Sequence, residues 1–130
     1  MKYMGIDYGL KRVGVALSDE EGKIAFPFAV LENNIDLINN LLKIVVDKKV
    51  EAIVLGESSN FHGEPNKIMG EVKIFARDLE EGIELPIHYE PEFLTSFQAE
   101  KTQYEMKGDR AALDASAAAI ILQSFLDKTS

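Results

Sequence analysis

Asp7 ends the first apolar stretch of the chain, just before a turn. Acidic residues are depleted inside strands, and a carboxylate there is costly unless a hydrogen bond, an opposite charge or a metal ion compensates its desolvation. Gly9 leaves room for a backbone or a ligand, and Lys11 and Arg12 each offer a cation to a phosphate. The segment indicates either an acid beside a phosphate-binding turn or a plain hairpin turn, because Asp and Gly are also common turn residues.

A second acid, Asp114, lies at the start of the last expected helix. Five apolar residues follow it at helical spacing: Ala117, Ala118, Ile121, Leu122 and Phe125. Position 114 therefore shares the core-facing stripe, where a carboxylate points into the protein or into a cleft. The alternative is a first-turn acid that complements the helix dipole, which accounts for the turn but not for the face.

Glu92 closes the segment after the last expected strand, and ligands of open α/β sheets gather at such strand ends. By itself Glu92 is equally compatible with an exposed loop acid, and Glu90 could point the same way. Three carboxylates from distant positions that meet at one sheet edge would form a hard oxygen site for Mg²⁺ or Mn²⁺. Two such ions can activate water and stabilise the leaving oxygen in phosphodiester hydrolysis.

The elements that must position these acids follow from periodicity and turn residues. The expected strands span residues 2–7, 12–18, 23–31, 52–56 and 86–89. The expected helices begin after a cap at Asn33 or Asn34, at Pro65, at Thr95 and at Asp109. The first helix is expected to bury an apolar stripe: Ile35, Ile38, Leu41, Leu42, Val45 and Val46.

Hairpins come first in this order and β-α-β crossovers follow. The order predicts an α/β fold with a mixed five-stranded sheet, in which an antiparallel meander of three strands precedes the crossovers and helices cover both faces. We expect one domain over residues 1–130.

The composition limits the possible functions. Fourteen basic and 22 acidic residues give a net charge of −8, so binding to nucleic acid would need a local basic patch or bridging cations. The chain has no Cys, which excludes thiolate catalysis, disulfides and Cys-based zinc sites. No apolar run approaches the roughly 18 residues of a membrane span. The first apolar stretch, which ends at Asp7, is too short for the hydrophobic region of a secretory signal. We therefore expect a cytoplasmic protein without a membrane partner.

Two segments resemble one known family. Residues 5–19, Gly-Ile-Asp-Tyr-Gly-Leu-Lys-Arg-Val-Gly-Val-Ala-Leu-Ser-Asp, resemble the opening signature of the YqgF/RuvX family. Residues 113–122, Leu-Asp-Ala-Ser-Ala-Ala-Ala-Ile-Ile-Leu, resemble its closing helix. These small bacterial proteins have a ribonuclease H-like fold and are described as Holliday junction resolvases and pre-16S rRNA nucleases. Length and element order agree as well, so the resemblance spans essentially the whole chain.

The resemblance implies roles for individual residues. It makes Asp7, Glu92 and Asp114 the catalytic acids and the ligands of Mg²⁺ or Mn²⁺. It also implies a set of phosphate-binding positions: Gly9, Lys11, Arg12 and Gly63.

The chain departs from the family pattern around the second acid. Pro91 and Phe93 flank Glu92 where the family has Asp and Arg, and Glu57 follows the fourth strand where the family has Leu. An Arg at this place would hold phosphate or orient carboxylates, which Phe93 cannot do. Glu90 could stand in for the missing acid.

Three hypotheses about function follow. The first is a metal-dependent endonuclease that cleaves structured nucleic acid, either the 5′ end of precursor 16S rRNA or a branched DNA. The second is a weakened or inactive family member that binds RNA or a ribosomal partner. The third, a nucleotide-binding protein related to actin-like folds, lacks the second lobe that would close over adenosine.

Overall fold

A computed structural model describes residues 1–9, 11–57, 67–91 and 110–129, without the side chains of 57, 67–72, 91 and 110–114. The strands are β1 (Tyr3–Tyr8), β2 (Arg12–Ser18), β3 (Ala25–Glu32), β4 (Ala52–Glu57) and β5 (Ile87–Pro91). They form one five-stranded sheet in the order β3-β2-β1-β4-β5. β2 is antiparallel to β1 and to β3, whereas β4 is parallel to β1 and to β5. This is the mixed sheet that the sequence predicts.

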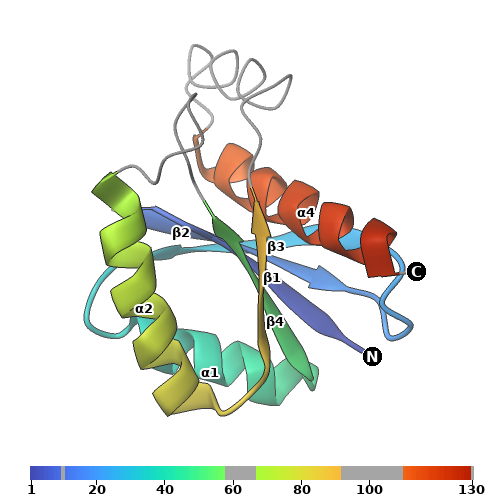
Figure 1. Cartoon of the computed structure of the whole chain (residues 1–130), viewed down its shortest axis with the longest axis horizontal. Coiled ribbons are helices and arrows are strands. Elements are labelled where there is room, and N and C mark those ends of the chain that lie inside the picture. The colour runs from blue at the N-terminus through green and yellow to red at the C-terminus, as the bar shows by residue number, and fades with distance from the viewer. Residues whose placement is uncertain (10, 58–66, 92–109, 130) are drawn as a thin grey trace.

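Three described helices cover the sheet: α1 (Leu37–Lys48), α2 (Lys67–Ile83) and α4 (Arg110–Thr129). Figure 1 shows α1 and α2 on one face and α4 on the other. The predicted helix at Thr95 lies outside the described residues, as does Pro65. None of the helices in the described ranges is long and apolar enough to cross a membrane.

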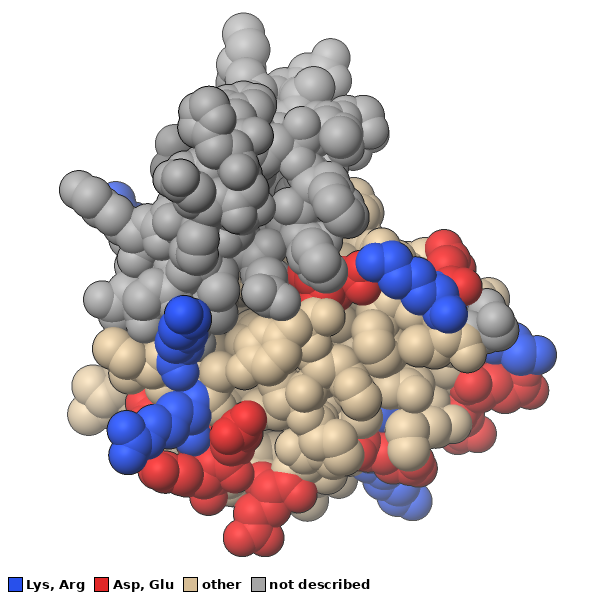
Figure 2. Space-filling model, viewed as in Figure 1, with Lys and Arg blue, Asp and Glu red and all other residues tan. Residues whose placement is uncertain are grey.

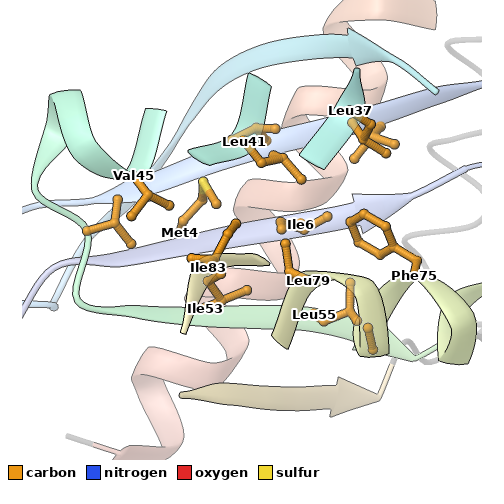
Figure 3. Packing of buried hydrophobic residues seen from close by; sticks show 14 of the residues in the cluster. Met4, Ile6, Leu37, Leu41, Val45, Ile53, Leu55, Phe75, Leu79 and Ile83 are labelled. Carbon is orange, nitrogen blue, oxygen red and sulfur yellow. The ribbon is translucent and has the colours of Figure 1, made fainter. Parts of the chain in front are cut away.

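The main core lies between the sheet and the pair α1 and α2. Met4 and Ile6 of β1 are completely buried there, because alternate residues of a strand point to the same face. α1 and α2 contribute residues that pack on this one face of the sheet, and Figure 3 shows them: Leu37, Leu41, Val45, Phe75, Leu79 and Ile83. The apolar face of the sheet thus fixes where both helices lie.

The start of α1 differs from the prediction. Ile35 precedes the helix and is 94% exposed, because Asn34 forms a turn in which its Oδ1 accepts from the Asp36 N–H at 3.0 Å and its carbonyl accepts from the Leu37 N–H at 3.1 Å. Val46 is 70% exposed as well, since it lies about 100° around the helix from Val45 and leaves the buried stripe. The predictions that these two apolar residues are buried are wrong.

On the opposite face, α4 lies unusually close to β1. A Cβ atom added to Gly5 would be 2.7 Å from the Leu122 Cβ and 3.0 Å from the Ala118 carbonyl oxygen. The predicted apolar stripe of this helix is confirmed, since Ala117, Ala118 and Leu122 are fully buried. Small residues on both elements therefore permit a helix-to-strand distance that a larger residue at position 5 would prevent.

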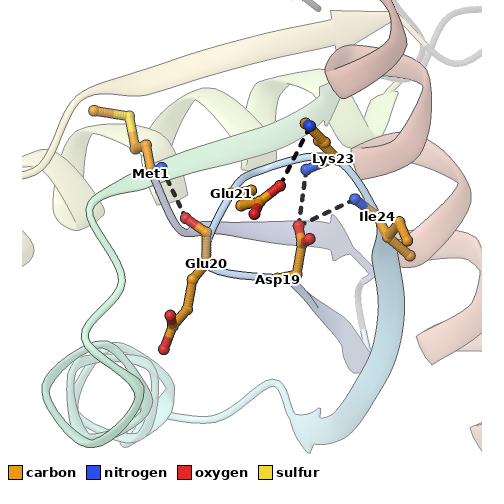
Figure 4. A network of polar contacts seen from close by, with 6 residues as sticks. All are labelled: Met1, Asp19, Glu20, Glu21, Lys23 and Ile24. Carbon is orange, nitrogen blue, oxygen red and sulfur yellow. Dashed lines mark hydrogen bonds and ion pairs between the residues drawn. The ribbon is translucent and has the colours of Figure 1, made fainter.

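The turn between β2 and β3 closes the sheet at the end away from Asp7. Asp19 Oδ1 accepts from the backbone N–H groups of Lys23 at 2.8 Å and Ile24 at 3.2 Å (Figure 4). These two hydrogen bonds hold the pKa of the Asp19 carboxyl below its ordinary value. Gly22 takes the left-handed conformation with φ of 73°, as the predicted turn requires. Asp19 therefore has a structural role.

Replacing Gly5 with Ala tests the close packing of α4 on β1. We expect Gly5→Ala to lower the free energy of unfolding by about 1–3 kcal/mol, since the helix must move to admit the methyl group. Urea denaturation measures the loss. Gly82→Ala is the control, because its added Cβ would meet a single side-chain atom, Ile38 Cγ2 at 3.0 Å, and no backbone of another element. A loss at Gly5 no larger than at Gly82 would contradict this packing.

Candidate active site

Asp7 lies near the carboxyl end of β1, on the sheet face that α4 covers. Tyr3 and Gly5 alternate with Met4 and Ile6 along the strand, and both contact α4. The alternation of side chains carries Asp7 onto this same face. Asp7 is half-buried, so a ligand at the strand end can still reach it.

α4 runs antiparallel to β1 and brings position 114 toward Asp7. The rings of Phe125 and Tyr3 lie 5.6 Å apart, and one to two helical turns earlier Leu122 and Ala118 contact Gly5. Moving back one further turn from Ala118 to position 114 advances about 6 Å along the helix, and moving from Gly5 to Asp7 advances about 7 Å along the strand. The backbone at position 114 therefore approaches the level of Asp7.

The turn after β1 and the start of β2 carry three of the four predicted phosphate-binding residues, Gly9, Lys11 and Arg12. A Cβ atom at Gly9 would lie 2.5 Å from the Arg12 carbonyl oxygen, so the turn is too tight there for any side chain. Asn33 holds the turn from the end of β3: its Nδ2 donates to the Gly9 carbonyl at 2.7 Å and its backbone N–H donates to the Lys11 carbonyl at 3.0 Å. Lys11 is exposed and Arg12 is half-buried.

The role of Asn33 differs from the one predicted. The sequence suggested a helix cap at Asn33 or Asn34, but α1 begins at Leu37 with no side-chain cap hydrogen bond. Asn33 instead joins the segment between β3 and α1 to the turn after β1. A preference of Asn for loops is visible in the sequence, but its partner 24 residues away is not.

Among the side chains that the structure describes on this face, Glu90 is a buried acid. In the parallel pairing of β1 with β4, Ile6 lies opposite Leu55, so Asp7 lies level with Gly56. In the pairing of β4 with β5, Gly56 lies opposite Glu90. Glu90 therefore lies on the level of Asp7, two strands away. Its side chain is only 2% exposed, and its Oε1 accepts hydrogen bonds from Lys128 Nζ and, at 3.4 Å, from Ser124 Oγ. We therefore assign Glu90 to joining β5 and α4 rather than to replacing a missing acid.

The remaining site predictions fall where the structure gives no side chains. Glu92 and Gly63 lie outside the described residues, and of Asp114 only the backbone in α4 is described. Among the side chains that are described, no three His, Asp or Glu residues gather closely enough to hold a metal ion. The catalytic and metal-binding roles of Asp7, Glu92 and Asp114 therefore stay predictions.

The described surface carries both signs of charge. Figure 2 shows Lys and Arg side chains interspersed with Asp and Glu on the face seen there. A negatively charged chain with such a surface would need local cations to bind a phosphate, and Lys11 is one exposed cation of the predicted phosphate-binding turn.

The sheet order and the helix across β1 define a ribonuclease H-like protein. Solved structures show the same fold: a complex of T. thermophilus RuvC with Holliday junction substrate has a TM-score of 0.61 at 17% identity, over 99% of this chain and 96% of that chain. The fowlpox virus Holliday junction resolvase has a TM-score of 0.56 at 11% identity, over 98% and 99% of the two chains.

The chain belongs to the RuvX family, described as Holliday junction resolvase, whose model matches residues 1–128. A relative from Maridesulfovibrio salexigens is 38% identical over 132 residues, covering 97% of this chain and 98% of the relative. A second, from Nitratidesulfovibrio vulgaris, is 36% identical over 133 residues, covering 98% and 94%. Both carry the name "Putative pre-16S rRNA nuclease". The predicted family and fold are confirmed.

Removing Lys128 tests the link between β5 and α4. We expect Lys128→Met to lower the free energy of unfolding by about 1–3 kcal/mol, because it leaves the buried Glu90 carboxylate without its cation. The double variant Glu90→Gln with Lys128→Met should lose less, since no buried charge remains. Chemical denaturation of the variants measures both effects.

The exposed pair of Arg77 and Glu81, 3.6 Å apart, provides the control. Arg77→Met should change the free energy of unfolding by less than about 1 kcal/mol, as is usual for exposed ion pairs. If Lys128→Met cost no more than Arg77→Met, the assigned role of Glu90 would be wrong.

Proposed function

We propose that this RuvX family member is a metal-dependent endonuclease that hydrolyses phosphodiester bonds in structured nucleic acid. Its principal substrate would be the 5′ end of precursor 16S rRNA in the cytoplasm, with Holliday junction DNA as the second candidate. The observation that carries the proposal is the close packing of α4 along β1, which brings the backbone at position 114 toward the level of Asp7. The names of the relatives support the choice of rRNA.

The proposed metal ligands are Asp7, Glu92 and Asp114. All three offer carboxylate oxygens, the ligands that Mg²⁺ and Mn²⁺ prefer. Glu90 lies on the same level of the sheet as Asp7. Its carboxylate is paired with Lys128, so we do not include it among the metal ligands. When bound, the ions would supply charge stabilisation at the phosphate and a water of lowered pKa.

The turn after β1 would orient the nucleic acid. Exposed Lys11 and half-buried Arg12 offer cations to phosphates on either side of the bond to be cleaved. Because Gly9 has no side chain, the backbone of the turn can pack against the Arg12 carbonyl. The hydrogen bond from Asn33 holds the Gly9 carbonyl in place. Holding the turn before the substrate arrives reduces the entropy lost on binding.

Asp7→Asn tests the nuclease directly. With a precursor 16S rRNA transcript and with a four-way DNA junction, we expect Mg²⁺- or Mn²⁺-dependent cleavage to fall more than about a hundredfold. Even outer-shell partners of metal ligands cost about 10–100-fold, and Asp7 is proposed as a ligand. The control is Asp47→Asn, whose side chain is 74% exposed on α1.

Two outcomes would contradict the proposal. Cleavage by Asp7→Asn equal to that of the unchanged protein, with contaminating nucleases excluded, would reject Asp7 as a catalytic acid. Tight RNA binding without turnover, together with no heat on titration with Mn²⁺, would support instead the RNA- or ribosome-binding protein that the departures at Pro91 and Phe93 suggest.

A further inference from the structure

A small groove lies beside the turn after β1, on the sheet face opposite α4. Its lining includes half-buried Tyr8 and buried Phe75, whose ring centroids are 4.7 Å apart. Its rim carries two strongly exposed apolar side chains: Ile35, which is 94% exposed, and Ile74, which is 60% exposed. Exposed apolar side chains beside a groove lined with aromatic residues are typical of a binding surface.

The groove adjoins the turn that follows β1 and therefore lies beside the strand end that carries Asp7. Tyr8 follows Asp7 directly, so the two side chains lie on opposite faces of the same strand end. Asn33 lines the groove and also donates to the carbonyl of Gly9 in the predicted phosphate-binding turn. A group that enters the groove would therefore lie beside the predicted phosphate-binding turn.

We propose that this groove receives one unpaired nucleobase of the nucleic acid substrate, next to the phosphate held at the turn. The inference rests on the proposed function and deepens it: the enzyme would prefer substrates with a single-stranded nucleotide beside the cleaved bond. Bases that are not stacked in a helix are commonly held against aromatic and apolar side chains and bonded at their edges.

The size and charge of the groove favour a base over other occupants. Its volume of about 190 Å³ is below the roughly 300 Å³ at which sites for drug-sized ligands begin, so it suits one flat ring system rather than a folded partner. Asp78 is the charged residue among its described lining. A phosphate would be repelled there, whereas the uncharged base would not.

Two side-chain amides can bond the edge of such a base. Asn33 uses its Nδ2 for the Gly9 carbonyl, and Asn34 uses its Oδ1 for the Asp36 N–H. The amide oxygen of Asn33 and the amide N–H groups of Asn34 provide an acceptor and donors at the groove. This pair matches the mixed donor and acceptor edges of nucleobases.

The test compares three labelled RNA stems, bound in Ca²⁺ and checked to be intact: one blunt, one with a short single-stranded overhang, and one whose overhang is abasic. Ile35→Ser with Ile74→Ser removes the apolar rim, and because both side chains are exposed we expect folding to be unaffected. Fluorescence anisotropy should show about tenfold weaker binding of the normal overhang by this variant. The unchanged protein should lose about as much when the overhang is abasic.

The controls separate the groove from the general surface and from the nuclease itself. Val46→Ser, which removes a 70% exposed apolar side chain elsewhere on α1, should leave all three affinities unchanged. Equal affinity for normal and abasic overhangs, or equal losses on the blunt stem, would overturn the base site. Cleavage by the unchanged protein is scored separately, so that a failed groove leaves the nuclease proposal intact and a failed nuclease is recognised as such.

Discussion

The close contact between α4 and β1 is the constraint on which the candidate site depends. Gly5 has no side chain, and this lets Leu122 and the Ala118 carbonyl approach to distances at which a Cβ atom would collide. The helix can then lie along β1 with its first turns near the strand's carboxyl end. A larger residue at position 5 would lift the helix and separate position 114 from Asp7.

Sheet topology supplies the rest of the arrangement. The parallel strands β1, β4 and β5 end at one edge, and the antiparallel return into β2 places Lys11 and Arg12 at that same edge. Glu90 and Lys128 join β5 to the far half of α4. The helix is therefore held at two places, over β1 by close packing and over β5 by a buried carboxylate, and both contacts restrict where its first turns can lie.

Much of the fold could be predicted from local pattern. Alternation and turn residues placed all five strands within two residues of where they lie, and the spacing from Ala117 to Leu122 identified the buried stripe of α4. The sequence predicts Ile35 to lie in the first helix, because apolar residues at helical spacing begin two residues before α1 does. The turn at Asn34 shows where the helix begins. Local pattern finds the elements better than it finds their ends.

The site was less accessible to prediction, for a physical reason. Asp7 and Asp114 break local rules, since each puts a carboxylate where apolar residues are expected, and so each is visible in the sequence. Glu92 breaks none, and its role came only from family resemblance. The contacts of Asn33 with Gly9 and of Glu90 with Lys128 span 24 and 38 residues, so they exist only once the chain is folded.

Diffraction from crystals soaked in Mn²⁺ tests the central claim most directly. The account predicts anomalous density about 2 Å from carboxylate oxygens of both Asp7 and Asp114, at the carboxyl end of β1. Density elsewhere, or carboxylates of these two residues more than about 10 Å apart, too far for an ion pair about 4 Å apart to bridge, would contradict it.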